Sequence, residues 1–169
     1  MAHEPRLSHS LRQLLHHRRT AALGSLASTA AGPEPFVSLV PYAIDAHSGL
    51  LVLHLSGLAA HTRQLQAQPL ASLMVAAAEP EDGAVHALER VSLQVRAHTP
   101  ERDSPEWLAA RTAYLARFAD VAFMMELGDF RLVCLQPLSA RHVAGFGAAR
   151  DVDAEALRQL LQTPPATAP

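Results

Sequence analysis

The segment from Phe36 to Ser72 constrains the fold of this chain more than any other segment. Its first two apolar runs are separated by only five turn-forming residues, and so short a connection joins antiparallel strands. A short helix stopped by Pro69 and a further apolar run follow. The elements predicted here are a strand over 36–44, a turn over 45–49, a strand over 50–55, a helix over 59–68 and a strand over 70–77.

The remainder of the chain also predicts strands joined by short links. Residues 90–98 alternate between apolar and polar side chains, which is the period of a strand with one wet face. Ser104 and Pro105 are typical of a helix cap and first helical position. Further predicted elements are a helix over 8–18, a strand over 20–29, a turn over 32–35, a loop over 78–89, helices over 105–117 and 121–127, a strand over 130–138 continued irregularly over 139–147, and a helix over 153–161.

These elements predict one domain over residues 1–162, followed by a disordered Pro/Ala-rich tail over 163–169. No Gly-x-Gly-x-x-Gly follows a strand, which disfavours a parallel dinucleotide fold. Six antiparallel strands must protect their edges, and closure into a small barrel does so. The expected fold class is mainly β with flanking helices, built on a six-stranded antiparallel barrel.

Composition excludes several classes of function. The 169 residues are 49% hydrophobic, and the net charge of -2 argues against a nucleic-acid binder. No apolar run reaches the roughly 18 residues of a membrane span. With no signal-like run before Arg12, we expect a cytoplasmic protein. The single cysteine, Cys134, lies in an apolar run and is expected to be a buried, inert thiol.

A candidate anion site lies where the strand over 50–55 gives way to a helix. The start of a helix exposes unpaired N–H groups and a partial positive charge, which attract phosphate. Ser56, His61, Thr62 and Arg63 stand around this helix start, and they offer hydroxyls, an imidazole and a guanidinium. The same residues allow a simpler interpretation, in which Ser56 caps the helix while Thr62 and Arg63 face solvent.

A second candidate site is the run from Ser38 to Tyr42. Pro41 has no N–H to donate to a sheet, so it belongs at an edge or a bulge and leaves backbone groups that a flat ligand could use. Tyr42 would add an aromatic face or a phenol. The alternative is an ordinary edge strand.

Ten histidines are present, but none has the spacing of a structural metal site, so we predict no protein metal centre. Adjacent His16 and His17 would point to different faces of a helix. Single histidines remain candidate axial ligands of a bound haem. The candidates are His61, His98 and His142, with His86 less well placed in a loop.

The order of these motifs resembles the pyridoxamine 5'-phosphate oxidase-like, FMN-binding split-barrel proteins, and most closely their haem-utilisation (HugZ-type) branch. The resemblance covers most of residues 8–150. It is carried by Leu26–Thr29, Pro35–Tyr42, Leu55–Leu65, Pro69–Leu73, Arg90–Leu93, Ala113–Phe118, Gly128–Phe130 and Gly145–Gly147.

The resemblance implies a homodimeric split barrel with two FMN sites at the dimer interface. It implies a flavin-dependent oxidoreductase acting on an unassigned small-molecule substrate or electron donor. Gln64 departs from the asparagine that the family often has there. The implied cofactor residues are Ser38, Val40, Pro41 and Tyr42 along the isoalloxazine, and Ser56, His61, Thr62 and Arg63 at the phosphate.

Two other functions stay open. The first is a haem-binding or haem-degrading protein. Haem-degrading members carry their ligating histidine near the C-terminus, whereas residues 148–152 contain none, and His142 is the nearest candidate. The second is a non-enzymatic flavin carrier or degenerate barrel, since no acid/base residue stands beside the presumed flavin. Pyridoxamine phosphate oxidation itself is disfavoured, because the paired arginine and histidine of those enzymes are missing.

Overall fold

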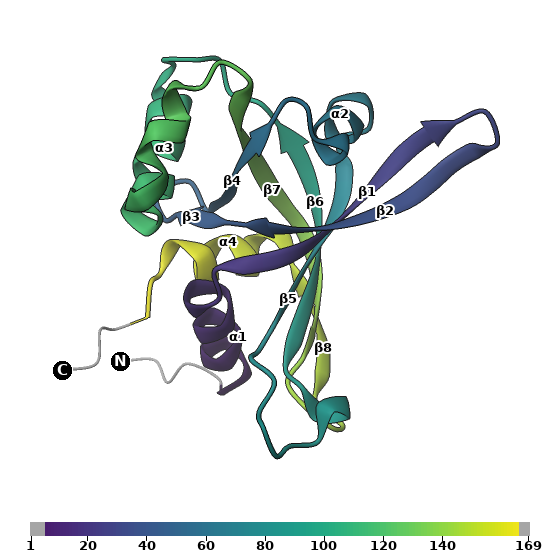
Figure 1. Cartoon of the computed structure of the whole chain (residues 1–169). Coiled ribbons are helices and arrows are strands. Elements are labelled where there is room, and N and C mark those ends of the chain that lie inside the picture. The colour runs from purple at the N-terminus through teal and green to yellow at the C-terminus, as the bar shows by residue number, and fades with distance from the viewer. Residues whose placement is uncertain (1–5, 166–169) are drawn as a thin grey trace.

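The computed structural model describes residues 6–165 as one eight-stranded antiparallel sheet with helices around it (Figure 1). The strands are β1 (Thr20–Thr29), β2 (Gly32–Pro41), β3 (Ala43–Asp45), β4 (Leu50–Ser56), β5 (Leu70–Ala76), β6 (Arg90–His98), β7 (Phe130–Val143) and β8 (Ala149–Asp153). The helices are α1 (Arg6–His17), α2 (Ala60–Ala67), α3 (Pro105–Arg117) and α4 (Ala154–Gln162), with 3-10 turns η1 (Val85–Ala87) and η2 (Ala119–Glu126).

The sheet has the strand order β2-β1-β5-β6-β7-β4-β3, and β8 pairs with β7. Its two outer strands, β2 and β3, follow one another in the chain with only Tyr42 between them. The sheet therefore curls around a core and brings its ends together through the chain, without a ladder of hydrogen bonds that closes it. This is a split-barrel arrangement.

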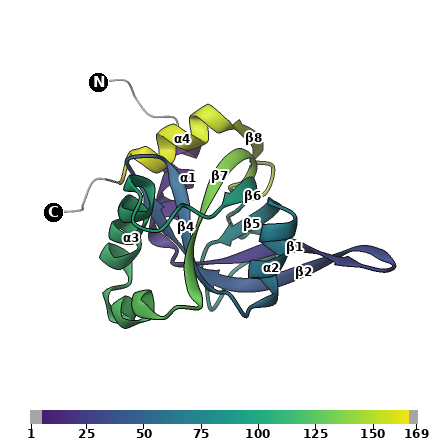
Figure 2. The same cartoon turned by 90° about the horizontal axis from the view of Figure 1, so that it is seen from above.

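Two hydrophobic cores hold the fold together. The larger core fills the inside of the curled sheet and is sealed by buried leucines of α1, α2 and α4, such as Leu15, Leu65 and Leu161. The smaller core lies on the outside of β3, β4 and β7, where α3 and η2 cover Val52 and Cys134. Seen from above, α3 and α2 lie on opposite sides of β7 (Figure 2). Strand β4 is consequently buried on both faces.

The mainly β class with flanking helices is confirmed, but the expected count of six strands is wrong. The strand expected over 36–44 is divided into β2 and β3, and β8 was not predicted at all. Residues 32–35, expected as a turn, extend β2, which tolerates its prolines because it is an edge strand. The segment expected as a helix over 121–127 is the 3-10 turn η2.

Two further expectations concerned a disordered C-terminal tail and the absence of a membrane-spanning segment. Residues 1–5 and 166–169 lie outside the described residues, and this includes most of the tail that was expected to be disordered. Within the described part, no helix is long and apolar enough to cross a bilayer.

The buried His54 of β4 predicts an acid-sensitive fold. Its ring lies between Tyr114 and Phe130, with centroids 5.6 and 5.0 Å away. Burial lowers the pKa of His54 below its ordinary value of 6.5, so the unfolded chain binds a proton there more readily than the folded one. Stability should therefore decline as the pH falls below about 6.5. Urea unfolding between pH 5 and 7 should give a flatter pH dependence for His54→Phe than for the wild type, and parallel curves would contradict this.

Candidate functional site

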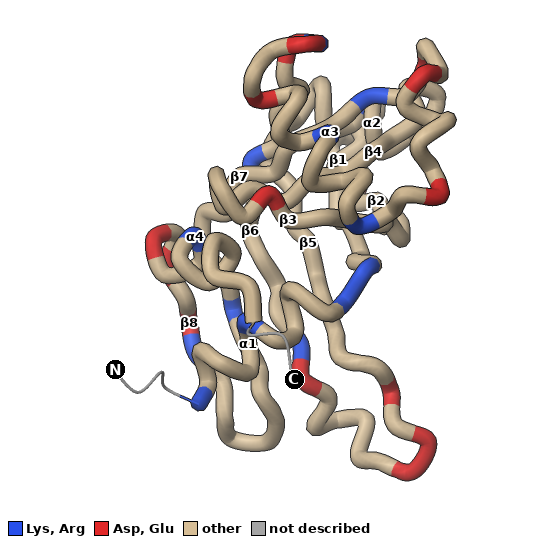
Figure 3. Tube along the Cα trace, turned by 90° about the vertical axis from the view of Figure 1, so that its left-hand side faces the viewer, with Lys and Arg blue, Asp and Glu red and all other residues tan. Residues whose placement is uncertain are grey.

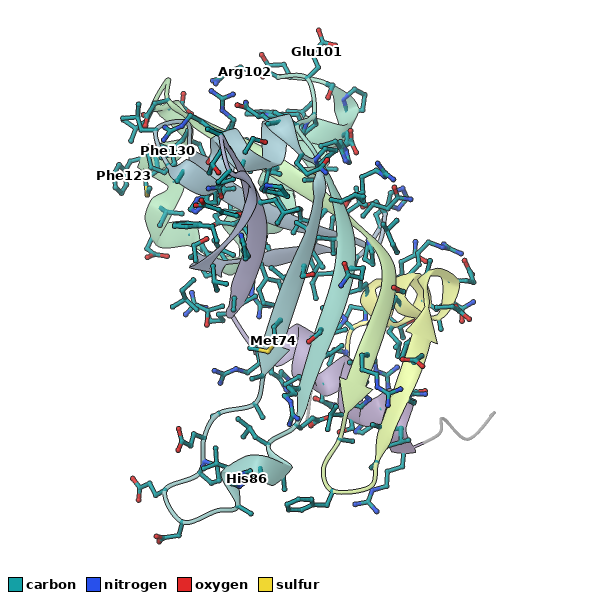
Figure 4. The ribbon with its side chains drawn as sticks, turned by 90° about the vertical axis from the view of Figure 1, so that its right-hand side faces the viewer. Met74, His86, Glu101, Arg102, Phe123 and Phe130 are labelled. Atoms are coloured by element: carbon teal, nitrogen blue, oxygen red, sulfur yellow. The ribbon has the colours of Figure 1, made fainter. Side chains whose placement is uncertain are left out.

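The outer side of β2, β1 and β5 forms a sheet surface that we call the open face. Residues paired across antiparallel strands point to the same side, so the register defines its rows. One row is Leu39, Ala22 and Met74, and the next is Val37, Gly24 and Ser72. Figure 4 shows this side of the sheet with Met74 on it and α1 behind the strands.

The open face is unusually apolar for a surface. Leu39 is 74% exposed and Val37 is 68% exposed, and Leu70 and Met74 are each more than two-fifths exposed. Helix α3 covers only the part of the outer side formed by β3, β4 and β7, so within residues 6–165 no helix packs on the open face. Contiguous exposed apolar side chains of this kind mark a surface that binds something.

A groove of about 310 Å³ crosses this face. Gly24 lines it, and a Cβ there would approach Ser72 only to the ordinary contact distance of 3.7 Å. Gln94 of β6 donates a hydrogen bond of 3.0 Å to the Ser72 hydroxyl at the border of the groove. The groove is lined by Gly24, Ser25, Leu26, Pro35, Phe36, Val37, Leu70, Ala71, Ser72 and Gln94.

Formal charge is scarce on the open face, with the exposed Arg96 beside Leu70 at its border. The acidic residues Glu79, Glu81 and Asp82 lie instead in the loop between β5 and β6 (Figure 3). The face therefore suits a largely apolar ligand or partner with an anionic edge.

Helix α2 borders the groove, because the Ser25 hydroxyl donates a 2.6 Å hydrogen bond to Gln64 Oε1. This contact gives Gln64 a structural role at a position where the family often has asparagine. One turn earlier on α2 lies His61, which is partly exposed. Its ring takes part in no side-chain hydrogen bond within residues 6–165, and burial lowers its pKa below 6.5. A neutral imidazole on α2 is in the form that binds a metal.

The start of α2 is less suited to phosphate than the sequence indicated. Its cap is Ala59, which contributes no side-chain acceptor, and not Ser56. Thr62 is buried, and its hydroxyl donates to the Ser56 carbonyl at 2.6 Å. Arg63 is exposed, and its guanidinium donates to the Leu58 carbonyl at 2.6 Å. The segment thus bonds these donors to its own backbone.

The charge next to Ser56 also makes the start of α2 less suited to phosphate. The Ser56 hydroxyl donates a 2.9 Å hydrogen bond to a carboxylate oxygen of Asp129. An acidic group at this distance repels a phosphate placed against the hydroxyl.

The second predicted site, on β2, is divided between the core and the surface. Pro41 is exposed, whereas Val40 and Tyr42 are buried in the larger core. The Tyr42 hydroxyl donates to the Leu15 carbonyl at 2.6 Å, so neither its ring nor its phenol faces a ligand. The Ser38 hydroxyl is buried, has no hydrogen-bond partner in the described chain, and lies on the inner side of the sheet with Leu23.

His142, proposed from the sequence as a haem ligand, is unsuitable in this fold. Its side chain is fully buried, and its Nε2 lies 2.8 Å from a carboxylate oxygen of Glu89. The Ser10 hydroxyl donates to the same oxygen at 2.5 Å and ties α1 to this pair. A haem iron cannot reach this ring without opening the core.

His86 is exposed in the loop between β5 and β6, below Met74 in Figure 4.

Sequence comparisons match the chain to one family model and to two relatives that are named heme oxygenases. A family model described as CREG, beta-barrel, matches residues 6–158. Heme oxygenase HutZ of Vibrio cholerae serotype O1 is 31% identical over 153 residues, which cover 90% of this chain and 84% of HutZ. The chloroplastic non-canonical heme oxygenase HOZ of Arabidopsis thaliana is 36% identical over 120 residues, which cover 68% of this chain but only 33% of HOZ.

Solved structures agree in fold. A heme binding protein from Mycobacterium smegmatis matches with a TM-score of 0.79 and 29% identity, covering 93% of this chain and 62% of that one. HutZ, described as a heme storage protein from Vibrio cholerae, matches with a TM-score of 0.66 and 30% identity, covering 81% and 91%. A putative pyridoxamine 5'-phosphate oxidase from Listeria innocua, at 12% identity and a TM-score of 0.60, covers 82% and 99% and shares the fold alone.

The burial of Tyr42 predicts a structural role without a ligand-binding one. Tyr42→Phe removes the donor to the Leu15 carbonyl and should destabilise the fold by about 1–3 kcal/mol, because a buried acceptor loses its partner. Urea unfolding measures this cost, and Leu39→Ala on the exposed face serves as a control for general effects of truncation. If Tyr42→Phe keeps full stability but loses affinity for FMN or haem, the structural role is refuted.

Proposed function

The chain belongs to the family described as CREG, beta-barrel, and from that premise we propose that it is a haem-binding protein of the heme oxygenase type. The observation that carries the proposal is its similarity, over 90% of its length, to heme oxygenase HutZ. The resemblance to the haem-utilisation branch of the split-barrel proteins is confirmed by the same comparison. Within that branch, the haem alternative is better supported than the flavin oxidoreductase expected first.

The residues of the open face fit a haem. A planar apolar macrocycle matches an exposed sheet surface bearing Val37, Leu39 and Met74. Arg96 offers a guanidinium at the border of the face for a propionate carboxylate. His61 on the adjoining helix offers a neutral imidazole for the iron.

When bound, the haem supplies one-electron and oxygen chemistry that side chains lack. The chain's own contribution is to bind and orient the group. The apolar strands would exclude water from the macrocycle, Arg96 would pair with its anionic edge, and His61 would offer a ligand to the iron.

FMN has weaker support on this chain. The groups expected to hold its phosphate, Thr62 and Arg63, are hydrogen-bonded to nearby backbone, and Asp129 adds a negative charge. The flavin-linked and pyridoxamine phosphate oxidase-like structures among its neighbours share its fold at 12–15% identity, which carries no cofactor with it. FMN is therefore the comparison ligand in the test.

A haem titration followed by the Soret band tests the proposal. The wild type should bind haem more tightly than FMN, and Gly24→Val should weaken haem binding at least about tenfold by filling the groove. His61→Ala should shift the Soret maximum, whereas His47→Ala, in the exposed turn after β3, should not. Tight FMN uptake without haem binding would overturn the proposal, and equal spectra for the two histidine variants would remove His61 as the ligand.

We also propose that two copies pair, as the family resemblance implies, and that they do so through the open face. The support is the run of exposed apolar side chains on this face, including Leu39 at 74% and Val37 at 68% exposed. A lysine in the middle of such an interface would be desolvated without a partner.

Light scattering should therefore give a dimer mass for the wild type and a monomer mass for Val37→Lys. Phe146→Lys, which replaces an equally prominent apolar side chain in the turn after β7, should remain a dimer. A monomeric wild type, with and without haem, would refute the pairing.

A further inference from the structure

Three side chains with metal-binding atoms meet where α3 approaches the sheet. His98 ends β6, Cys134 is its direct partner on β7, and Glu106 lies in the first turn of α3. One nitrogen, one sulfur and one oxygen from these residues all lie within 4.8 Å of one another. The sequence predicted no protein metal site, because the three positions follow no ligand spacing and converge only through strand register and helix packing.

We propose that His98, Glu106 and Cys134 form a binding site for a thiophilic divalent cation, Zn²⁺ above all. Imidazole, thiolate and carboxylate together suit zinc, whereas calcium and magnesium prefer oxygen ligands alone. Zinc bonds of about 2.0–2.3 Å require neighbouring ligand atoms to stand roughly 3–4 Å apart in a tetrahedron. The existing separations therefore need only small rotations of two surface side chains.

The surroundings hold the three groups in place before any ion arrives. Ser104 caps α3 by accepting a hydrogen bond from the Trp107 N–H, and this fixes the turn that carries Glu106. Cys134 is held by the smaller core and is 1% exposed. His98 Nε2 and Glu106 Oε1 are already 2.7 Å apart. An ion would thus tie the start of α3 to β6 and β7.

An ion can also reach the site. The side chains of His98 and Glu106 are 42% and 45% exposed, so the ligand set opens to solvent on one side. That side leaves room for water as the fourth ligand. His98 also lines a cavity of about 320 Å³ between α2 and the end of β6, which places the open coordination position near a space for a small molecule.

The Cys134 thiol must lose its proton to bind a metal ion. Burial first, then the carboxylates of Glu106 and Asp45, raises the pKa of the Cys134 thiol to about 12. The free protein therefore carries a neutral thiol at neutral pH. A thiolate spectrum should appear only when a metal ion has displaced the proton.

Cobalt titration of the full-length purified protein tests the site, with Co²⁺ as a probe for Zn²⁺. Because Cys134 is the chain's single cysteine, a sulfur-to-cobalt charge-transfer band in the near ultraviolet reports this site alone, even though the chain has ten histidines in all. We expect the band to saturate at one ion per chain and to be abolished by stoichiometric Zn²⁺.

Variants separate the metal site from a mere His98–Glu106 ion pair. His98→Gln and Glu106→Gln change exposed side chains, and each should weaken Co²⁺ binding at least about tenfold. His47→Gln is the matched control and should leave the titration unchanged. Cys134→Ser should remove the band, with circular dichroism to confirm folding. No charge-transfer band in the wild type, or an unaltered band in both His98→Gln and Glu106→Gln, would overturn the proposal. Neither outcome depends on haem binding.

Discussion

The fold depends on how Tyr42 is held between β2 and β3. Its N–H donates to the Arg19 carbonyl at 3.0 Å, and its hydroxyl donates to the Leu15 carbonyl of α1. The Arg117 guanidinium lies 5.7 Å from the centre of its ring, so α3 is linked to the same point. This fully buried residue fixes where the chain leaves one edge of the sheet and joins the other. The curl that follows leaves the apolar outer side of β1, β2 and β5 without a covering helix in residues 6–165, and α2 only borders it at Ser25.

Two physical consequences follow from this arrangement. Helices α1, α2 and α4 pack against the larger inner core, and α3 packs against the smaller outer core. None of these four helices therefore covers the open face. An uncovered apolar sheet is costly in water, and its natural complement is a flat apolar ligand, a second copy, or both. Haem binding and dimerisation would thus both use the open face. Gly24, which has no side chain, leaves room in the groove on that face.

Local signals in the sequence were sufficient for most elements. Alternation identified β6, and the caps Ser104 and Asp153 marked the starts of α3 and α4. Strand β8 was missed because Ala149–Asp153 has no apolar run, and it exists only by pairing with β7. The resemblance identified the split barrel, which no local pattern could specify.

The site was harder to predict, for reasons that lie in tertiary structure. Hydroxyl and guanidinium groups near a helix start suggest an anion site, but Thr62 and Arg63 instead bond to nearby carbonyls. The alternation that buries Val40 and exposes Leu39 cannot be read from a strand whose residues are apolar on both sides. His142 was a candidate haem ligand in the sequence, but its side chain is fully buried and paired with Glu89. The His98, Glu106 and Cys134 group needed both register and helix placement to become visible.

Hydrogen–deuterium exchange with and without haem tests whether the open face is the surface that binds haem. Strand β2 is an edge strand, so its outward N–H groups should exchange readily in the free protein. Haem should slow exchange in peptides from β1, β2 and β5 and in the first turn of α2. Protection confined to α3 and η2, with β1, β2 and β5 unchanged at saturating haem, would contradict it.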